Sequence, residues 1–128
     1  MFLIRLCAAM LLTLFSALAA LADKRVALII GNSDYQTVGA LDNPINDASD
    51  LAIALEGLGF DVFLGTDLTR DEMLSLAESY GATAADSDVS LLFYAGHGFQ
   101  VDGRNYLVPV DANLTSAADI AEQTVAME

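Results

Sequence analysis

Three short apolar segments, separated by two stretches of helical periodicity, restrict the fold more than any other feature of this sequence. Residues 26–32, 60–67 and 89–95 have the length and apolar character of buried strands. Between them, apolar residues recur at spacings of three and four, as they do in amphipathic helices. This alternation predicts a parallel sheet with helices on both faces. We therefore expect an α/β three-layer sandwich with a mainly parallel, Rossmann-like sheet.

Local signals refine the boundaries of the predicted elements. Thr69 is the expected N-cap of the second helix, and Glu72, three residues later, completes a capping box. After the third strand, the Asp-Gly pair at 102–103 lies between two short alternating segments and predicts a hairpin. A last helix is expected to begin at Thr115 or Ser116 and to continue to the end of the chain or nearly so.

The first 22 residues have the composition of a secretory signal peptide. One basic residue, Arg5, precedes an apolar run over 6–22 that ends in Ala20, Leu21 and Ala22, a small-x-small pattern that signal peptidase cleaves. The run of 17 residues is at the lower limit for crossing a bilayer, so a retained membrane anchor is the alternative. We expect a signal peptide over 1–22, a single domain over 23–128, and a secreted or periplasmic protein.

Composition excludes several classes of function. The chain carries 5 basic and 18 acidic residues, a net charge of −13, and loss of Arg5 with the leader would make the charge −14. Such a charge repels phosphate, so we expect no nucleic-acid partner. Cys7 is the single cysteine and lies in the predicted leader, so a processed chain would have no disulfide and no thiolate metal site. We expect no cofactor and no metal.

The single histidine, His97, follows the third apolar segment and is flanked by Gly96 and Gly98. In open α/β sheets, functional residues gather at the carboxyl ends of the strands, and His97 is expected at such an end. Residues 31–35 and 65–67 follow the other two strands and are expected nearby. A histidine there is either a general base, whose nucleophile then has to be identified, or a structural side chain at a strand end.

Three blocks of this sequence resemble the caspase-like cysteine peptidases, in particular their bacterial caspase-like and metacaspase branch. They are "RVALIIGNSDY", "LDNPINDASDLAIALEGLGFDV" and "LLFYAGHGFQVDGRNYLVPVDA", in that order between Arg25 and Ala112. The resemblance implies a caspase-like fold and an endopeptidase that uses a Cys–His dyad. His97 then matches the catalytic histidine. Gly98 matches the residue whose backbone N–H helps to form the oxyanion hole.

The resemblance also suggests a substrate preference. Asp47 matches an acidic residue at the base of the primary specificity pocket of metacaspases, where a carboxylate would favour Arg or Lys before the scissile bond. The alternative is an acid in the first turn of a helix, where it stabilises the macrodipole. Asp111 belongs to the family pattern but receives no role from it. The acid-rich insertion of calcium-activated metacaspases has no counterpart here, so calcium dependence is not implied.

The nucleophile of the family has no counterpart in these residues. In caspases the cysteine follows the histidine by roughly 50 residues, whereas 31 residues follow His97 and none is cysteine. We therefore expect the N-terminal, large-subunit portion of a caspase-like domain, truncated after the third core strand and the following hairpin. Such a chain is expected to be inactive in isolation, and its third strand is expected to have an unpaired edge.

Three functions remain open from the sequence. The first is the large-subunit half of a secreted caspase-like endopeptidase that cleaves a peptide or protein substrate, either truncated as a gene fragment or completed by a separate C-terminal chain carrying the cysteine. The second is a non-catalytic pseudo-peptidase that binds peptides or proteins, with self-association through the open sheet edge. The third is a flavodoxin-like or receiver-type domain, which is disfavoured because a receiver needs a lysine near its aspartate and the single lysine, Lys24, precedes the first strand.

Overall fold

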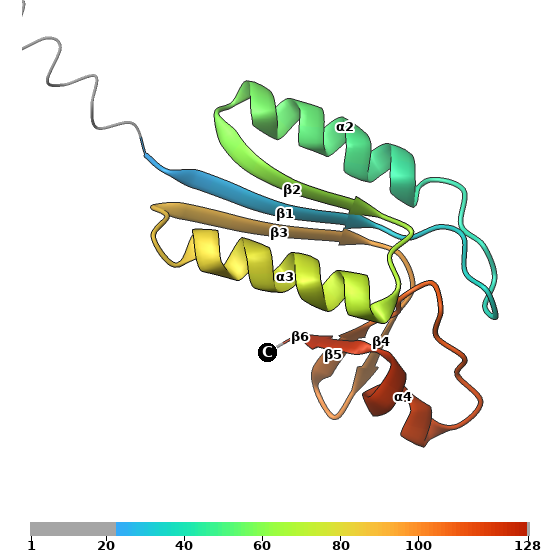
Figure 1. Ribbon diagram of the computed structural model, residues 1–128. Coiled ribbons are helices and arrows are strands. Elements are labelled where there is room, and N and C mark those ends of the chain that lie inside the picture. Colours follow the sequence, from blue (N-terminus) through green and yellow to red (C-terminus); the bar gives the residue numbers. More distant parts are fainter. Residues whose placement is uncertain (1–22, 128) are drawn as a thin grey trace, which may run out of the picture.

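A parallel sheet lies between two helices, and a smaller antiparallel sheet lies beside it near the carboxyl ends of its strands (Figure 1). The computed structural model describes residues 23–127, so the predicted signal peptide over 1–22 lies outside the described residues. In chain order the elements are β1 (Arg25–Gly31), α2 (Pro44–Gly57), β2 (Phe60–Thr66), α3 (Arg70–Ala84), β3 (Val89–Ala95), β4 (Gly98–Val101), β5 (Arg104–Leu107), α4 (Ala117–Gln123) and β6 (Val125–Met127).

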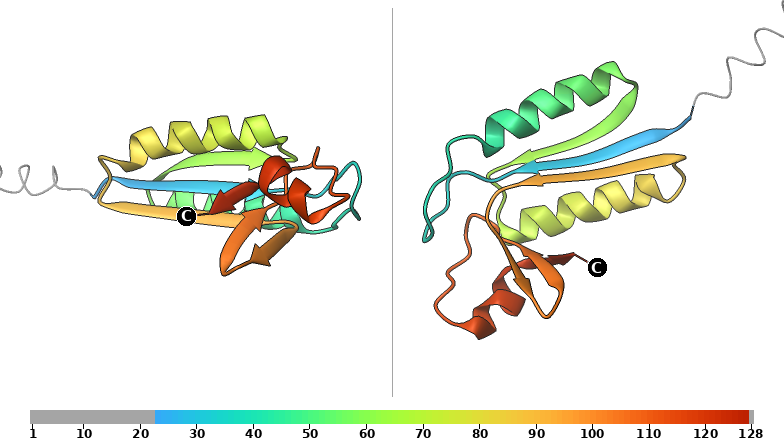
Figure 2. Two further views of the ribbon diagram at one scale, coloured as in Figure 1. Left: turned by 90° about the horizontal axis from the view of Figure 1, so that it is seen from below. Right: turned by 180° about the vertical axis from the view of Figure 1, so that it is seen from behind.

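The parallel sheet has the order β2-β1-β3, which confirms the predicted three-layer α/β architecture. β1 pairs with both neighbours along its whole length and is almost completely buried. Its side chains alternate between the two faces, as those of a strand must. Ala27 and Ile29 pack against α2, whereas Leu28 and Ile30 pack on the side of α3. Figure 2 shows α2 and α3 on opposite faces of the sheet.

The two helices begin and end where local chemistry dictates. α2 starts with Pro44, whose missing N–H costs nothing in the first turn. It is followed by Gly59 with φ 81°, a conformation that favours glycine. In α3, the Thr69 side chain accepts from the Glu72 N–H and the Glu72 carboxylate accepts from the Thr69 N–H, so the predicted capping box is confirmed. Met73 then enters the core.

The predicted hairpin is confirmed as β4 and β5. Asp102 and Gly103 form its two-residue turn with φ 51° and 78°. Two positive φ angles in succession are the geometry of a type I′ turn, which explains the Asp-Gly sequence.

The prediction for the last residues was wrong. α4 ends at Gln123, and β6 follows it and pairs with β5 instead of continuing the helix. Thr124 is buried between the two elements, and its carbonyl accepts a hydrogen bond from Arg70 Nε at 3.1 Å. Val125 packs with Leu107 and the α3 side of the core. Tertiary contacts therefore stabilise this three-residue strand, and a prediction from local helix propensity does not include them.

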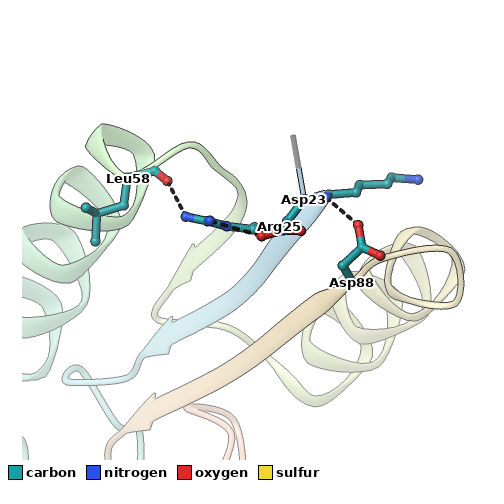
Figure 3. Close-up of polar contacts among 5 residues, drawn as sticks. Asp23, Arg25, Leu58 and Asp88 are labelled. Carbon is teal, nitrogen blue, oxygen red and sulfur yellow. Dashed lines mark hydrogen bonds and ion pairs between the residues drawn. The ribbon is translucent and has the colours of Figure 1, made fainter. Parts of the chain in front are cut away.

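The amino-terminal end of β1 is tied to the turn before β3, as Figure 3 shows. The Lys24 N–H donates to Asp88 Oδ2 at 2.8 Å, and Asp88 N–H donates back to the Lys24 carbonyl. Arg25 reaches the Leu58 carbonyl and the Asp23 carboxylate, both at 3.3 Å. These contacts are exposed and contribute little to stability, but they set the register at the end of the sheet remote from His97.

β3 is an edge of the parallel sheet, since within residues 23–127 it pairs with β1 alone. Two of its apolar side chains are unusually exposed, Val89 at 41% and Leu92 at 46%. A long apolar edge of this kind favours pairing with a further strand. None of the helices in the described part of the chain has the length and apolar character that a bilayer-spanning segment needs.

Candidate functional site

The carboxyl ends of the three parallel strands meet at one edge of the sheet. The register pairs Gly31, the last residue of β1, with Thr66 of β2 and Ala95 of β3. Backbone bonds continue this alignment into the loops: Asn32 N–H donates to the Ala95 carbonyl at 2.9 Å. The loops that follow the three strands therefore lie together, as the sequence predicted, and His97 lies in one of them.

The His97 ring is held by the loop that leads from β1 to α2. Its Nε2 lies 2.7 Å from the Gly39 carbonyl oxygen, and its ring centroid lies 4.7 Å from that of Tyr35 with an interplanar angle of 54°. A carbonyl oxygen accepts only, so the hydrogen lies on Nε2. Nδ1 has no hydrogen-bond partner among residues 23–127, and in the neutral ring it is the basic nitrogen.

The main chain of His97 is fixed on both sides by tyrosine hydroxyls. Its N–H donates to the Tyr35 hydroxyl at 2.8 Å, and its carbonyl accepts from the Tyr94 hydroxyl at 2.7 Å and from Val108 N–H at 3.1 Å. The two hydroxyls lie 3.2 Å apart. Burial, with a further contribution from Tyr35, raises the pKa of Tyr94 far above its ordinary value, so this hydroxyl keeps its proton and remains a donor.

Gly96 is needed for this arrangement. A Cβ at this position would lie 2.5 Å from the hydroxyl oxygens of both Tyr35 and Tyr94. Real Cβ atoms do not approach polar atoms so closely, and both hydroxyls occupy the space that a side chain would take. The glycine before His97 therefore makes room for the groups that hold the histidine main chain.

Gly98 presents a free backbone N–H. Val108 N–H donates to the His97 carbonyl, which makes 97 and 108 a hydrogen-bonding position of the antiparallel ladder. The next pair, Gly98 opposite Leu107, is then a non-hydrogen-bonded pair, so the Gly98 N–H points away from β5. Within residues 23–127 we find no acceptor for this N–H outside the strand pairing. An unsatisfied donor next to a histidine is what oxyanion stabilisation requires.

Asn32, which the sequence analysis did not single out, joins the loop after β1 to the loop after β2 and to the segment after β5. It is completely buried. Its Oδ1 accepts from Leu68 N–H at 2.9 Å, and its Nδ2 donates to the Val108 carbonyl at 3.2 Å. Asp67, with φ 50°, contributes a similar link because its Oδ1 accepts from the N–H groups of Ser33 and Asp34. The asparagine directly after the Gly31 stop was the only available signal.

Asp47 and Asp111, the two acidic residues that the family resemblance singled out, lie in separate parts of the structure. Asp47 is in the first turn of α2, is exposed, and its carboxylate makes no hydrogen bond or ion pair within residues 23–127. The loop before α2 contacts the His97 imidazole through Gly39, but within residues 23–127 no hydrogen bond or ion pair joins Asp47 to His97. Asp111, which had no role in the sequence analysis, accepts from Arg70 N–H at 3.0 Å and thereby caps the first turn of α3.

An open cavity of about 470 Å³ lies between the end of β3 and the small sheet, and Tyr94, Gly96 and Gly98 contribute to its lining. The His97 ring does not line it. A second, more apolar cavity of about 220 Å³ lies beside it, between α3, Leu92 and β6. The two share Leu107 and Met127, and β3 contributes Tyr94 to the first and Leu92 to the second. Within residues 23–127, no cluster of three or more His, Cys, Asp or Glu is arranged to hold a metal ion.

Comparison with known proteins agrees with this arrangement. The chain is 38% identical over 92 residues to the mucosa-associated lymphoid tissue lymphoma translocation protein 1 of Homo sapiens, and equally to its homolog in Mus musculus. It is 31% identical over 86 residues to caspase-1 of Sus scrofa. The matches cover 72% and 64% of this chain but only 11% and 21% of the human and pig proteins. The family model for the caspase domain matches residues 24–126, and the chain therefore belongs to the caspase domain family.

Proposed function

We propose that this chain is the histidine-bearing part of a caspase-like cysteine endopeptidase, with His97 as its acid and base. The observation that carries the proposal is the orientation of the imidazole. Gly39 accepts from Nε2, which leaves Nδ1 as a basic nitrogen without a partner in the described residues. A catalytic base needs one nitrogen to hold the ring and the other to accept the proton.

The chemistry follows from that geometry. Nδ1 takes the proton of a cysteine thiol, and the thiolate attacks the substrate carbonyl carbon. The Gly98 N–H donates to the oxygen that becomes negatively charged in the tetrahedral intermediate. The protonated imidazole then gives its proton to the leaving amine as the peptide C–N bond breaks. Water, deprotonated by the same nitrogen, hydrolyses the thioester and regenerates the thiol.

The thiolate in this proposal comes from outside residues 23–127, which contain no cysteine. Cys7, the remaining candidate, lies outside the described residues. The free edge of β3 supports a separate segment as the source. A strand added parallel to β3 would place its carboxyl end beside His97, because carboxyl ends of parallel strands meet at one edge. We propose that a complementing C-terminal chain supplies this strand and that the 128-residue chain alone is inactive.

Two finer parts of the proposal concern specificity and location. Asp47 is exposed and unpaired in the described residues, so its carboxylate is available to an Arg or Lys side chain of a substrate. The resemblance of three sequence blocks to the bacterial caspase-like and metacaspase branch supports the same preference. Residues 1–22 have the composition of a signal peptide, which supports export to the periplasm or beyond the cell.

Fluorogenic peptides with Arg, Lys or Asp before the scissile bond test the proposal. The purified chain should show no turnover above that of H97A. Co-expression with the product of the reading frame directly downstream should produce turnover of the Arg and Lys peptides. This turnover should be abolished by H97A and reduced by at least tenfold in D47N. Turnover by C7A that resists thiol alkylation would contradict the mechanism.

The second candidate function is a peptide-binding or protein-binding module without catalysis. The exposed apolar residues of β3 and the apolar cavity beside Leu92 favour it, because such an edge binds extended segments by strand addition. The same edge could pair two copies of this chain. Binding of a fluorescent Arg-containing peptide, followed by its recovery uncleaved in the presence of the downstream product, would favour this candidate over the peptidase.

A further inference from the structure

The surroundings of His97 contain two phenols, one buried and one half-buried, that the proposed chemistry does not use. Tyr35 lies in the loop after β1 and Tyr94 lies on β3, 59 residues apart in the sequence, and their hydroxyl oxygens are 3.2 Å apart. Tyr35 is 7% exposed. Two hydroxyls meeting in a buried place lose hydrogen bonds to water, so their partners in the protein must compensate.

The direction of each hydrogen bond in this pair follows from the number of protons. The Tyr35 oxygen accepts a hydrogen bond from the His97 N–H, which makes no other hydrogen bond within residues 23–127. Tyr94 has two carbonyls within reach, His97 at 2.7 Å and Val108 at 3.0 Å, and carbonyls only accept. The single Tyr94 proton therefore goes to a carbonyl, and the Tyr35 proton goes to the Tyr94 oxygen. The shorter of the two Tyr94 bonds goes to the His97 carbonyl. With this bond, a series of hydrogen bonds runs from the His97 N–H through both hydroxyls to the His97 carbonyl.

We propose that Tyr35 and Tyr94 are positioning residues that fix the main chain of His97 and thereby the orientation of its imidazole. This inference rests on the proposed function of His97 as a base. The closed chain of hydrogen bonds restrains both peptide groups of His97, and Cα is then restrained as well. The Tyr35 ring also lies against the imidazole at 4.7 Å, so one residue restrains both the backbone and the ring.

The consequence for the site is a single tautomer. The contact between Nε2 and Gly39 requires the ring to keep its place to within a few tenths of an ångström, because a hydrogen bond weakens steeply with distance and angle. If the main chain of His97 were free to rotate, Nε2 would leave the Gly39 carbonyl. Nδ1 and Nε2 would then share the proton, and the basic nitrogen would no longer have a fixed direction.

The chain has one histidine, so nitrogen NMR of its imidazole reports on this site alone. The full chain, labelled with ¹⁵N-histidine and carrying no histidine tag, is measured at a pH where the ring is neutral. The wild type should show Nε2 in the protonated range and Nδ1 in the unprotonated range. In Y35F, which keeps the ring and removes the hydroxyl, the two shifts should move toward each other. Y94F should move them in the same direction.

Y80F is the matched control. The Tyr80 ring packs against Phe63, and no hydrogen bond of its hydroxyl is found in the described residues. It should leave both nitrogen shifts unchanged. Exchange of the His97 amide is a second measurement: it should accelerate roughly fivefold to tenfold in Y35F, the factor for one net hydrogen bond. It should be unchanged in Y80F.

The inference is overturned if Y35F and Y94F, both folded by circular dichroism, keep the wild-type nitrogen shifts. If one variant unfolds, the other decides the question. These measurements need no thiol and no substrate, so a failure of the proposed peptidase activity leaves them interpretable. Where the complemented enzyme is active, Y35F should lower kcat more than it raises KM. An equal effect of Y80F on kcat would also count against the positioning role.

Discussion

Replacement of Gly96 by alanine is the sharpest test of how the site is built. The new Cβ would lie 2.5 Å from both tyrosine hydroxyls and 2.8 Å from Cζ of Tyr94. Neither ring has room to withdraw without losing its bonds to His97. Forcing a methyl group into a packed site costs about 1–3 kcal/mol, and each lost hydrogen bond costs about 0.5–1.5 kcal/mol. We expect G96A to lower the free energy of unfolding by about 3 kcal/mol.

Thermal unfolding followed by circular dichroism measures this effect. For a domain of about 100 residues, 1 kcal/mol corresponds to roughly 4–8 °C, so the Tm should fall by at least about 12 °C. G39A is the matched control. A Cβ at Gly39 meets no atom within 4 Å, although its carbonyl also serves His97, so its Tm should change by no more than about 3 °C.

The physical reason can be separated from the size of the effect by a double-mutant cycle. If the Cβ acts by displacing hydroxyls, G96A should cost at least about 1 kcal/mol less in a Y35F background than in the wild type. Equal costs in both backgrounds would show that the hydroxyl does not explain the glycine. A G96A Tm within about 3 °C of the wild type would refute the packing argument altogether.

Three other changes test neighbouring parts of the structure. G81A, in the last turn of α3 where a Cβ meets open space, should raise the free energy of unfolding by about 0.5–1 kcal/mol in urea melts. N32A should lower it by about 2–4 kcal/mol in the same assay, because the Leu68 N–H loses its buried acceptor. The capping contacts with Thr69 hold the pKa of Glu72 below its ordinary value of 4.5. Its contribution is therefore present at pH 7 and lost on acidification, so the Tm difference between wild type and E72Q should shrink between pH 7 and pH 3.

Most of the fold follows from local signals in the sequence. The three apolar segments became β1, β2 and β3 because each is short and apolar and is separated from the next by a helical pattern, although only β1 is buried along its length. The capping box at Thr69 and the Asp-Gly turn at 102–103 depend on neighbouring residues alone, and both are confirmed. β6 was missed because its formation depends on β5, whose paired residues lie 18 to 22 positions away.

The candidate site divides in the same way. The two glycines around the lone histidine drew attention to His97, whereas the roles predicted for His97 and Gly98 came from the resemblance to the caspase-like peptidases. The partners of His97 were not predictable, because the Gly39 carbonyl and the Tyr35 hydroxyl come from a loop 58 and 62 residues earlier. Every residue has a backbone carbonyl, so the sequence does not show which carbonyl will bind the imidazole. A tyrosine in a loop is too common to be informative. The role of Asp111 as a cap of α3 likewise depends on a contact across 41 residues.

Three open groups of the described residues lie within one stretch of ten residues around the end of β3. The free edge of β3 begins at Val89, the unpartnered Nδ1 belongs to His97, and the free N–H belongs to Gly98. The other polar groups of His97 are paired: its main chain with Tyr35 and Tyr94, and its Nε2 with Gly39. Buried polar groups and sheet edges are costly to leave open. Under the proposed function, the free edge of β3 would receive a further strand and Nδ1 of His97 would receive the proton of a reacting thiol.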